Sequence, residues 1–497
     1  MNLRFFEKRN AERFNEGFVK RFQKVGESLT LALLVFLPAC VTSHYDRTEN
    51  FTFSWKIGDF EQAAKEAENL AESGPKRDRM LYRMEEGATK RLRRDHQGSV
   101  RAFQEVSAHY DKWFGVHLRS KTKISEELIS SIGTPEWKPY KSRVYERVML
   151  RLYQALNFME LGKQGRARAE IFKTRQAVQD AKELWNAELT ASRELMSKRG
   201  IDLEKGFNRA EANQLKEETD RLKAMIPSDL GDYVNPAAIY LEALYFLHGG
   251  TQRDDYEKAF FSLRQLYALY PENPWIREDY EQARKGTSSE EDLTYVFFET
   301  GRAPVRREKR FDLPLIFLSE TSRLPYAGLA LPTLVTNDNF LETLEVRGQN
   351  ESSWSRTVPL ADMDGIVAKE FAKDYPIEMT KAITGSLAKG GLQYLATDAV
   401  RSEKEPVRAV TGVAVGAFSQ SITRSDWRSW STLPKQIQFC KIKTPASREL
   451  TLRGVRTNLV KKVSLGPEKT KLLWIRSISA HTPLILVNSF SMDPQSP

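Results

Sequence analysis

Residues 144–160 read VYERVMLRLYQALNFME, and this stretch is the clearest helical segment of the chain. Val144, Val148, Leu152 and Leu156 recur every fourth residue, which places them on one face of an α-helix. Gly162 follows shortly and marks the expected end of this helix. One apolar face of this length must pack against other elements, so the first half of the chain is expected to be helical.

The segments around this helix show the same periodicity. Helices are expected at residues 58–71, 77–94, 97–110, 165–198, 207–225, 235–247 and 255–270. Those between 165 and 225 are rich in charge, which predicts a long helical hairpin projecting from the body.

A short turn, an aromatic or aliphatic residue and an alanine open several of these helices, as at Phe60/Ala63, Val100/Ala102 and Tyr256/Ala259. This pattern resembles degenerate tetratricopeptide repeats, whose helix pairs stack into a solenoid. The resemblance implies a concave partner-binding surface, and the alternative is an irregular helical bundle without a groove. Side chains that could contact a partner are Tyr145, Tyr153, Asn157, Tyr240 and Tyr256.

The pattern changes after a polar break at residues 286–292. Strands are expected at residues 293–298, 313–318, 341–346, 437–442, 449–452, 472–475 and 483–487. Residues 362–400 predict a helix, with Asp362 as its N-cap and Pro376 as a break or fresh start. The apolar stretch 411–422 is too short to span a bilayer and reads as a buried helix. Residues 301–310 form a basic segment that is expected to be a solvated connector or a contact to anionic lipid headgroups.

The predicted fold class is therefore α+β, with an N-terminal all-α, tetratricopeptide-like region followed by a smaller α+β domain. The expected division is a signal peptide at 1–39, a linker at 40–55, a helical region at 56–285 and an α+β domain at 293–490.

Residues 29–40, LTLALLVFLPAC, carry no charge and follow the basic residues Lys20, Arg21 and Lys24. Eleven apolar residues are too few to cross a bilayer but match the apolar core of an export signal. Leu37-Pro38-Ala39-Cys40 resembles the lipobox of bacterial lipoproteins, although proline at position 38 departs from the usual small residue. The resemblance implies cleavage before Cys40 and acylation of its thiol. The long basic region before Leu29 suggests that translation starts at a non-AUG codon near Val19.

The sequence shows few residues in patterns typical of catalysis, metal binding or nucleic-acid binding. The net charge of +10 is spread over a chain of mixed sign, which is weak support for nucleic-acid binding. Six scattered histidines show no metal-ligand spacing, so neither a metal site nor a cofactor is predicted. With Cys40 acylated, Cys440 has no disulfide partner, and its apolar neighbours indicate a buried thiol.

Several short motifs together resemble a widespread family of uncharacterised bacterial envelope lipoproteins with a repeat-like N-terminal region. They are Tyr145-Glu-Arg-Val148, Tyr153-Gln-Ala-Leu-Asn157, Asn235-Pro236 with Tyr240-Leu241, Pro271-Glu-Asn-Pro274, Phe298-Glu-Thr-Gly301, Leu329-Ala-Leu-Pro332 and Asp426-Trp-Arg-Ser-Trp430. The resemblance implies location and architecture and assigns no functional residue. From their chemistry alone, Asp426, Trp427, Arg428 and Trp430 read as a structural corner or as a docking site.

These observations predict a lipoprotein anchored in the outer membrane on the periplasmic side, with the inner membrane and the cell surface left open. The expected function is a non-catalytic scaffold that binds an envelope protein. The alternatives are an enzyme that acts on cell-wall material through the α+β domain and a purely structural lipoprotein.

Overall fold

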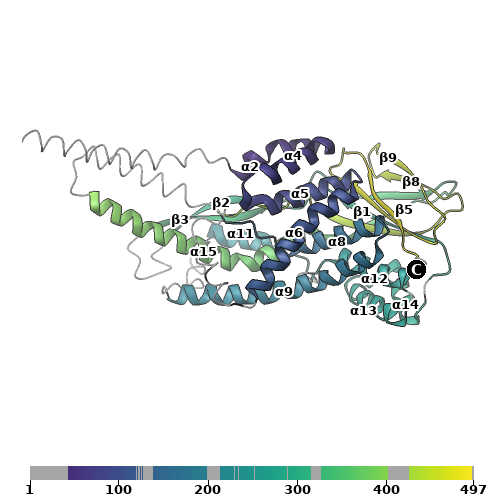
Figure 1. Ribbon diagram of the computed structural model, residues 1–497, viewed down its shortest axis with the longest axis horizontal. Helices are drawn as coiled ribbons and strands as arrows, with labels where there is room; N and C mark the ends of the chain where they lie inside the picture. The colour runs from purple at the N-terminus through teal and green to yellow at the C-terminus, as the bar shows by residue number, and fades with distance from the viewer. Residues whose placement is uncertain are drawn as a thin grey trace, which may run out of the picture.

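The computed structural model describes residues 43–494, except 119, 121–123, 125, 127–137, 199–212, 229, 233, 251, 288, 315–325 and 401–424. An N-terminal helical region is followed by a region with sheets, which confirms the predicted α+β class (Figure 1). Cys40 and the apolar stretch 411–422 lie outside the described residues. Within the described ranges, each helix is either too short or too polar to cross a bilayer.

The described part of the helical region is a succession of helices. Its helices are α2 (His44–Arg47), α3 (Glu49–Ile57), α4 (Phe60–Ser73), α5 (Arg79–Leu92), α6 (His96–His117), α8 (Val144–Glu160), α9 (Gln164–Lys198), α11 (Asn213–Ala224), α12 (Pro236–Gly249), α13 (Arg253–Leu269) and α14 (Pro274–Lys285). Each helix from α3 to α6 packs on the next, α8 packs on α6 and α9, and α12 to α14 form a second run. Consecutive packing of this kind is compatible with a repeat-like region.

Helix α8 lies at the centre of the helical region, because it contacts α6, α9, α12, α15 (Met363–Val400) and the last strand, β11 (Ile485–Ser491). Residues 144–159 are all buried, so other elements pack against every face of α8 and not only against the predicted apolar face. Two buried amides of α8 have internal partners: Gln154 donates to Ser107 at 2.7 Å, and Asn157 donates to Ser99 at 2.9 Å. These contacts offset the cost of burying amides.

A linker was predicted at residues 40–55, but the described part of this range, residues 43–55, is helical and packed. Phe51 and Trp55 of α3 are 2% and 3% exposed and pack against Ile478 and Val487 near the other end of the chain. Because these aromatic side chains are buried by the C-terminal strands, residues 43–55 belong to the body, and the prediction of a linker is wrong for them.

The second region contributes eleven strands among the described residues. They are β1 (Leu293–Thr300), β2 (Val305–Pro314), β3 (Tyr326–Val335), β4 (Leu344–Gly348), β5 (Ser355–Arg356), β6 (Val358–Asp362), β7 (Gln436–Lys443), β8 (Glu449–Gly454), β9 (Val460–Ser464), β10 (Thr470–Ser477) and β11. One sheet has the order β11-β10-β1-β7-β6, and a smaller one has the order β5-β4-β8-β9. Strands β1 and β10 are parallel, and the other neighbours in both sheets are antiparallel.

Both faces of the five-stranded sheet are covered. Phe297 and Trp474 stack at 4.7 Å and point with Tyr295 into the core shared with the helices. The alternate residues, including Val296 and Cys440, pack against the four-stranded sheet. Side chains alternate between the two faces of a strand, so β1 is buried along its whole length.

Helices α12 and α14 are fixed to this sheet by a buried carboxylate. Asp279 of α14 accepts hydrogen bonds from the hydroxyls of Tyr240 at 2.6 Å and Tyr295 at 3.0 Å. The Nζ of Lys441 on β7 donates to the same carboxylate at 2.7 Å. Asp279 is 0% exposed, so Lys441 neutralises a charge that water does not reach, and the two hydroxyls take the place of water as hydrogen-bond donors.

One hydrophobic cluster includes residues from both halves of the chain, such as Leu81, Leu156, Phe297 and Trp474. The expected boundary between residues 285 and 293 therefore does not separate two independent cores. The halves interlock, because α15 packs on α8 and α9 and the C-terminal strand packs on α5 and α8.

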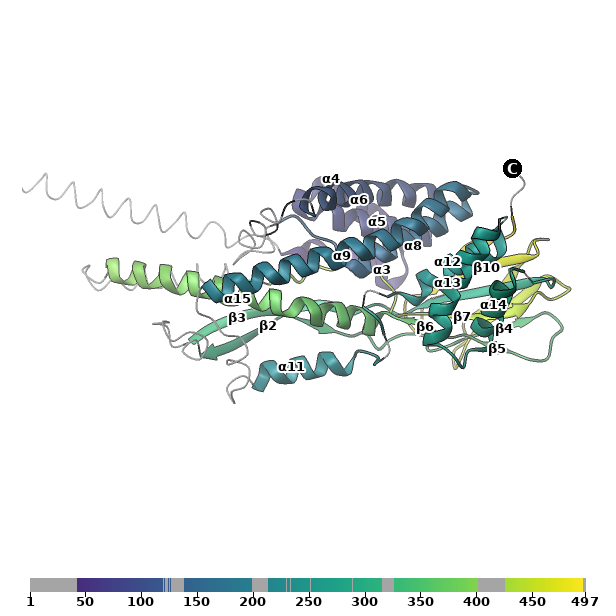
Figure 2. The ribbon, with the colours of Figure 1, turned by 90° about the horizontal axis from the view of Figure 1, so that it is seen from below.

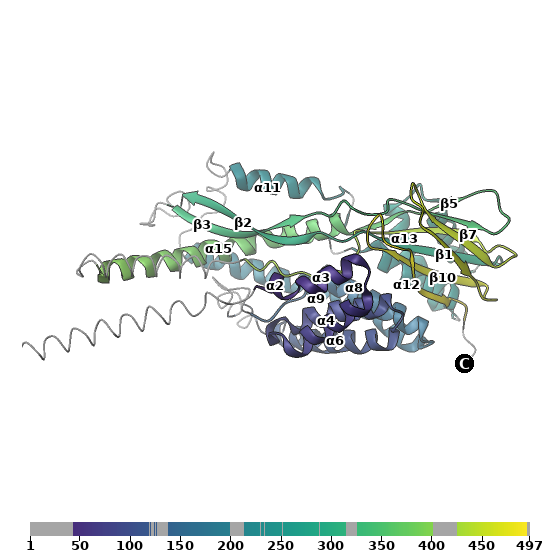
Figure 3. The same cartoon turned by 90° about the horizontal axis from the view of Figure 1, so that it is seen from above.

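Helices α9 and α11 do not form the predicted projecting hairpin. Figures 2 and 3 show α15 and the β2–β3 hairpin between them. Arg221 of α11 donates to the backbone oxygen of Leu334 on β3 at 2.9 Å, and Leu222 is 1% exposed. Packing on α15 and β3 therefore replaces the contact that was expected between the two charged helices.

Two local predictions in the second half are also wrong. Most of the basic segment 301–310 is strand β2 and not a connector, although Arg307, Lys309 and Arg310 are exposed to solvent as expected. Arg306 is 2% exposed, and its guanidinium lies 4.7 Å from the centre of the Phe371 ring. Helix α15 continues through Pro376 without a break. Tyr375 and Ile377, on either side of this proline, are buried, and this packing outweighs the backbone hydrogen bond that proline cannot make.

Candidate functional site

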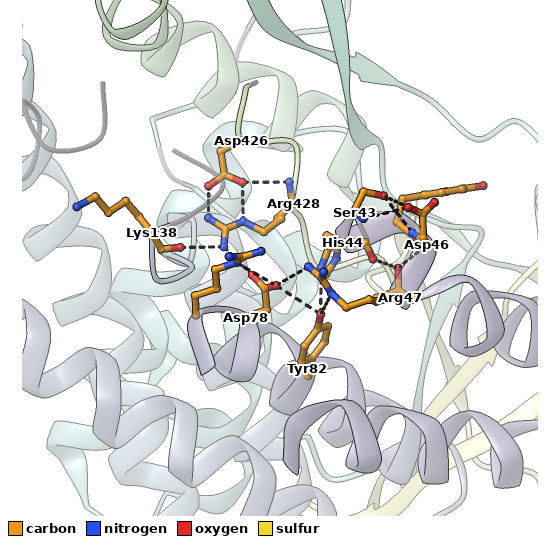
Figure 4. Close-up of polar contacts among 12 residues, drawn as sticks. Ser43, His44, Asp46, Arg47, Asp78, Tyr82, Lys138, Asp426 and Arg428 are labelled. Carbon is orange, nitrogen blue, oxygen red and sulfur yellow. Dashed lines mark hydrogen bonds and ion pairs between the residues drawn. The ribbon is translucent and has the colours of Figure 1, made fainter. Parts of the chain in front are cut away.

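The corner formed by residues 425–434 is held by a buried ion cluster (Figure 4). The guanidinium of Arg428 donates to Asp426 at 2.7 Å and to Asp78, just before α5, at 2.7 Å. It also donates to the backbone oxygen of Lys138 at 3.0 Å. Arg428 and Asp78 are each 1% exposed, so this cluster joins three distant segments without access to water.

The same cluster reaches the first helix of the described chain. Asp78 also accepts a hydrogen bond from Arg47 at 3.2 Å, and the ring of His44 stacks on Tyr82 at 5.6 Å (Figure 4). Burial lowers the pKa of His44 to about 4, so this ring is neutral at pH 7. Ser43 forms a capping box with Asp46, which fixes the direction in which the chain enters α2.

The two tryptophans of the corner face different surroundings. Trp430 is 2% exposed and lies 5.8 Å from Phe103 and 5.9 Å from Tyr153, whereas Trp427 lies 6.2 Å from Tyr45. They do not form one common surface, and Arg428 and Trp430 are interior residues. This placement supports the structural interpretation of the corner over the docking interpretation.

A second buried carboxylate, Glu85 of α5, accepts hydrogen bonds from the N–H and hydroxyl of Ser431, both at 2.7 Å, and from the hydroxyl of Thr432 at 2.7 Å. Burial raises the pKa of Glu85 to about 7 despite these donors. A carboxyl with a raised pKa stabilises the folded state below its ordinary pKa and loses that contribution as the pH rises through the folded pKa.

We therefore expect Glu85→Gln to change the pH dependence of stability. Between pH 5 and pH 8 the wild type should lose up to about 3 kcal/mol of unfolding free energy relative to the variant, because only the wild type must ionise a buried group. Urea unfolding of both proteins at the two pH values measures this difference. Parallel pH profiles would show that Glu85 is already ionised at pH 5.

A cleft with a volume of about 110 Å³ opens beside this corner, between the start of α8, α9 and α15. Its charged lining residues are Lys138, Lys141, Arg143, Arg147, Glu188, Glu370, Asp374, Glu378, Lys381 and Asp426. Five of them are basic and five are acidic, which makes the cleft polar but balanced in sign. We refer to it as the charged cleft.

The carboxylate of Glu370 closes the inner end of the charged cleft. It accepts hydrogen bonds from the backbone N–H groups of Val144 at 2.6 Å and Tyr145 at 2.9 Å, which otherwise lack partners at the start of α8. Burial raises the pKa of Glu370 to about 7. Arg143 pairs with Asp374 at 3.6 Å, and Lys381 pairs with Glu378 at 3.3 Å. Such a cleft can exchange internal ion pairs for those of a partner with charges of both signs.

The residues predicted to contact a partner lie elsewhere. Tyr145, Tyr153, Asn157 and Tyr240 are between 0% and 4% exposed, and Tyr256 is half-buried. Helix α8 is enclosed on all sides, and Tyr240 packs against the sheet, so the first four side chains stabilise the core and are not presented to a partner in this structure.

Sequence reasoning missed Arg147, Glu85 and Glu370, which are all buried. A signal was present for Arg147, because residues 144–160 carry charges inside a strongly apolar helix, and a charge there must find an internal partner or a ligand. Cys440 is 0% exposed, and burial raises its pKa to about 12, so it is the inert thiol that its apolar neighbours predicted. Within the described ranges, no three His, Cys, Asp or Glu side chains are grouped as a metal site requires.

Comparisons of the chain with protein-family models, with curated proteins and with solved structures gave no match.

Proposed function

We propose that the protein is a lipid-anchored, non-catalytic scaffold of the bacterial cell envelope that binds an envelope protein. The anchor is the acylated thiol of Cys40, and the basic segment with the apolar residues 29–39 directs export. Stable attachment requires two or more acyl chains, as the lipobox resemblance implies. Val41 after the cysteine favours the outer membrane and the periplasmic face.

The observation that carries the proposal is that the folded body includes Ser43 and His44, close in sequence to Cys40. Cys40 precedes Ser43 by three residues, which span at most about 10 Å. Ser43 is already the N-cap of α2, and His44 is 9% exposed. With no free linker between Ser43 and the body, an acyl chain on Cys40 holds the folded body directly at the membrane surface.

The charged cleft is the surface of the described body that fits a protein partner best. Its aromatic side chain Trp185 donates to the backbone oxygen of Lys373 at 3.3 Å, and its charges of both signs suit a polar peptide segment. Its walls are helices, so the side chains that a partner meets are held on regular secondary structure.

The alternative is an enzyme that acts on cell-wall material, and the acidic face of α15 favours it. Glu370, Asp374 and Glu378 line one cleft, and a carboxyl with a pKa near 7 suits general acid–base catalysis. The test is incubation of purified cell wall with each protein. If the wild type releases soluble fragments and Glu370→Gln does not, this alternative is supported.

The test of the scaffold uses intact cells with a photo-crosslinking residue in place of Lys141, which lines the charged cleft. We expect palmitate labelling and one dominant crosslinked partner, and we expect both to be lost with Cys40→Ala. A crosslinker in place of Lys285, which is exposed at the end of α14, is the matched control. Persistent palmitate on the Cys40 variant would refute the anchor, and equal crosslinking from 141 and 285 would refute the cleft as the binding surface.

A further inference from the structure

A second, larger cavity lies between α6, α8 and α9, and its volume is about 370 Å³. Its inner wall is largely apolar and includes Tyr110, Phe114, Leu150 and Ala177, while Gly115 and other exposed residues lie at its rim. Small-molecule sites usually enclose about 300–1,000 Å³, mostly between apolar walls with a few polar groups. The cavity therefore has the size and lining of a site for a small, largely apolar molecule.

Arg147 of α8 is shared by this cavity and the charged cleft. It is 6% exposed, and its guanidinium lies 3.9 Å from the centre of the Phe114 ring. Among the residues that the structure describes, none forms a hydrogen bond or an ion pair with this guanidinium, and its Nε is fully enclosed. A cation in this position lacks the neutralising contact that burial normally requires.

Arg151, one turn further along α8, differs from Arg147 in having ion-pair partners. Arg151 also lines the cavity, but its guanidinium pairs with Asp111 at 2.5 Å and with Glu170 at 2.8 Å. Lys173 at the rim pairs with Glu170 at 3.3 Å. Of the basic residues in the cavity wall, Arg147 is thus the one whose charge is left for a ligand.

The charges around Arg147 limit what that ligand can be. Glu370 of α15 and Asp180 of α9 act on it as negative charges, and Arg151 acts as a positive one. Burial is the larger influence, and it lowers the pKa of Arg147 to about 10, so the group remains a cation at pH 7. Two carboxylates nearby disfavour a ligand with two negative charges, and the fork of a guanidinium matches a single carboxylate.

We propose that this cavity binds a monocarboxylate with an apolar body, such as a medium-chain fatty acid or an aromatic acid. The carboxylate pairs with the guanidinium of Arg147, and the apolar body lies between Tyr110, Phe114, Leu150 and Ala177. The volume is more than twice the roughly 150 Å³ that holds benzene, which corresponds to a body of about ten carbon atoms. The proposal depends neither on the anchor nor on the scaffold.

The test is calorimetric titration of the purified full chain with decanoate below its micellar concentration and with decanol, which has a neutral head. We expect saturable binding of one decanoate per chain and at least tenfold weaker binding of decanol. Arg147→Met should weaken decanoate binding at least tenfold and leave decanol binding unchanged. Arg253→Met removes an arginine whose side chain is 95% exposed, and it should bind both probes as the wild type does.

Two further variants keep the test decisive if Arg147→Met fails to fold. Ala177→Leu fills the cavity and should abolish binding of both probes. Asp180→Asn removes a competing negative charge at the rim and should tighten decanoate binding. The proposal is overturned if the wild type does not bind decanoate saturably, if decanoate and decanol bind equally, or if Asp180→Asn weakens decanoate binding.

Discussion

Replacement of Arg428 with alanine is expected to lower the free energy of unfolding by about 3–5 kcal/mol, because it removes the cation that two carboxylates share. Asp426 loses its ion-pair partner, and Asp78 keeps only its longer contacts with Arg47 and Arg77. The side chain of Asp78 is 1% exposed and that of Asp426 is 14% exposed, so water replaces the lost guanidinium only in part, on the side of Asp426. Burial alone would raise the pKa of Asp426, but the charge and hydrogen bonds of Arg428 hold that pKa well below its usual range. Urea unfolding at pH 7, followed by circular dichroism, measures the loss.

The matched control is Arg253→Ala, which removes an arginine from an exposed pair with Glu257 on α13. Exposed pairs contribute about 0–1 kcal/mol, so this variant should unfold close to the wild type. A change below about 1 kcal/mol for Arg428→Ala would show that water enters the corner and that the cluster does not hold the helices to the second region.

The second large effect is expected for Asp279→Ala, again about 3–5 kcal/mol of unfolding free energy. The substitution removes the acceptor shared by Tyr240, Tyr295 and Lys441, and it leaves the buried ammonium of Lys441 with Glu278 alone as an acidic partner. The hydroxyl of Tyr240 loses its acceptor in a closed core, which adds to the cost, whereas that of Tyr295 keeps its contact with Nε2 of His248 at 3.0 Å. Thermal unfolding followed by tryptophan fluorescence should show a lower midpoint.

Glu281→Ala on the same helix is the control for Asp279→Ala. Glu281 pairs with Arg284 across one turn, and both side chains are well exposed, so its loss should cost about 0.5 kcal/mol or less. Similar costs for the two substitutions would mean that α14 is held to the sheet by apolar packing and not by the carboxylate.

The sequence predicted those elements whose pattern does not depend on distant partners. The stripe beginning at Val144 marked α8, and the residues after Asp362 marked α15 nearly to its ends. Asp362 also accepts the hydrogen bond from the N–H of Asp364 that its role as N-cap requires. Strands β1 and β10 were also predicted, because a strand that is buried on both faces has a nearly continuous run of apolar residues.

Elements whose stability comes from tertiary contacts were missed. Strand β3 was not predicted, and β2 was taken as a basic connector because Arg306, Arg307 and Arg310 resemble a solvated loop. The pairing of β2 with β3 and the stacking of Arg306 on Phe371 become visible only when α15 is in place. Strands of this kind carry no periodic pattern that a single sequence could reveal.

The candidate sites were less predictable than the fold, because their partners are far apart in the chain. Glu85 and Ser431 are separated by 346 positions, and Glu370 and Val144 by 226. Nothing in the local sequence of Glu370 shows that it caps another helix. The corner around Arg428 was recognisable as a cluster of unusual residues, yet its attachment to Asp78 depends on the complete tertiary structure.

The packing of α3 against the end of the chain has a consequence for biosynthesis. Phe51 and Trp55 are covered by Ile478 and Val487, so the first helices cannot complete their core before the ribosome has added the last strands. The parallel pairing of β1 with β10 adds another contact between distant segments, and such topologies fold slowly. Domains commonly fold in order from the N-terminus during synthesis, but this chain must remain incomplete until its end emerges.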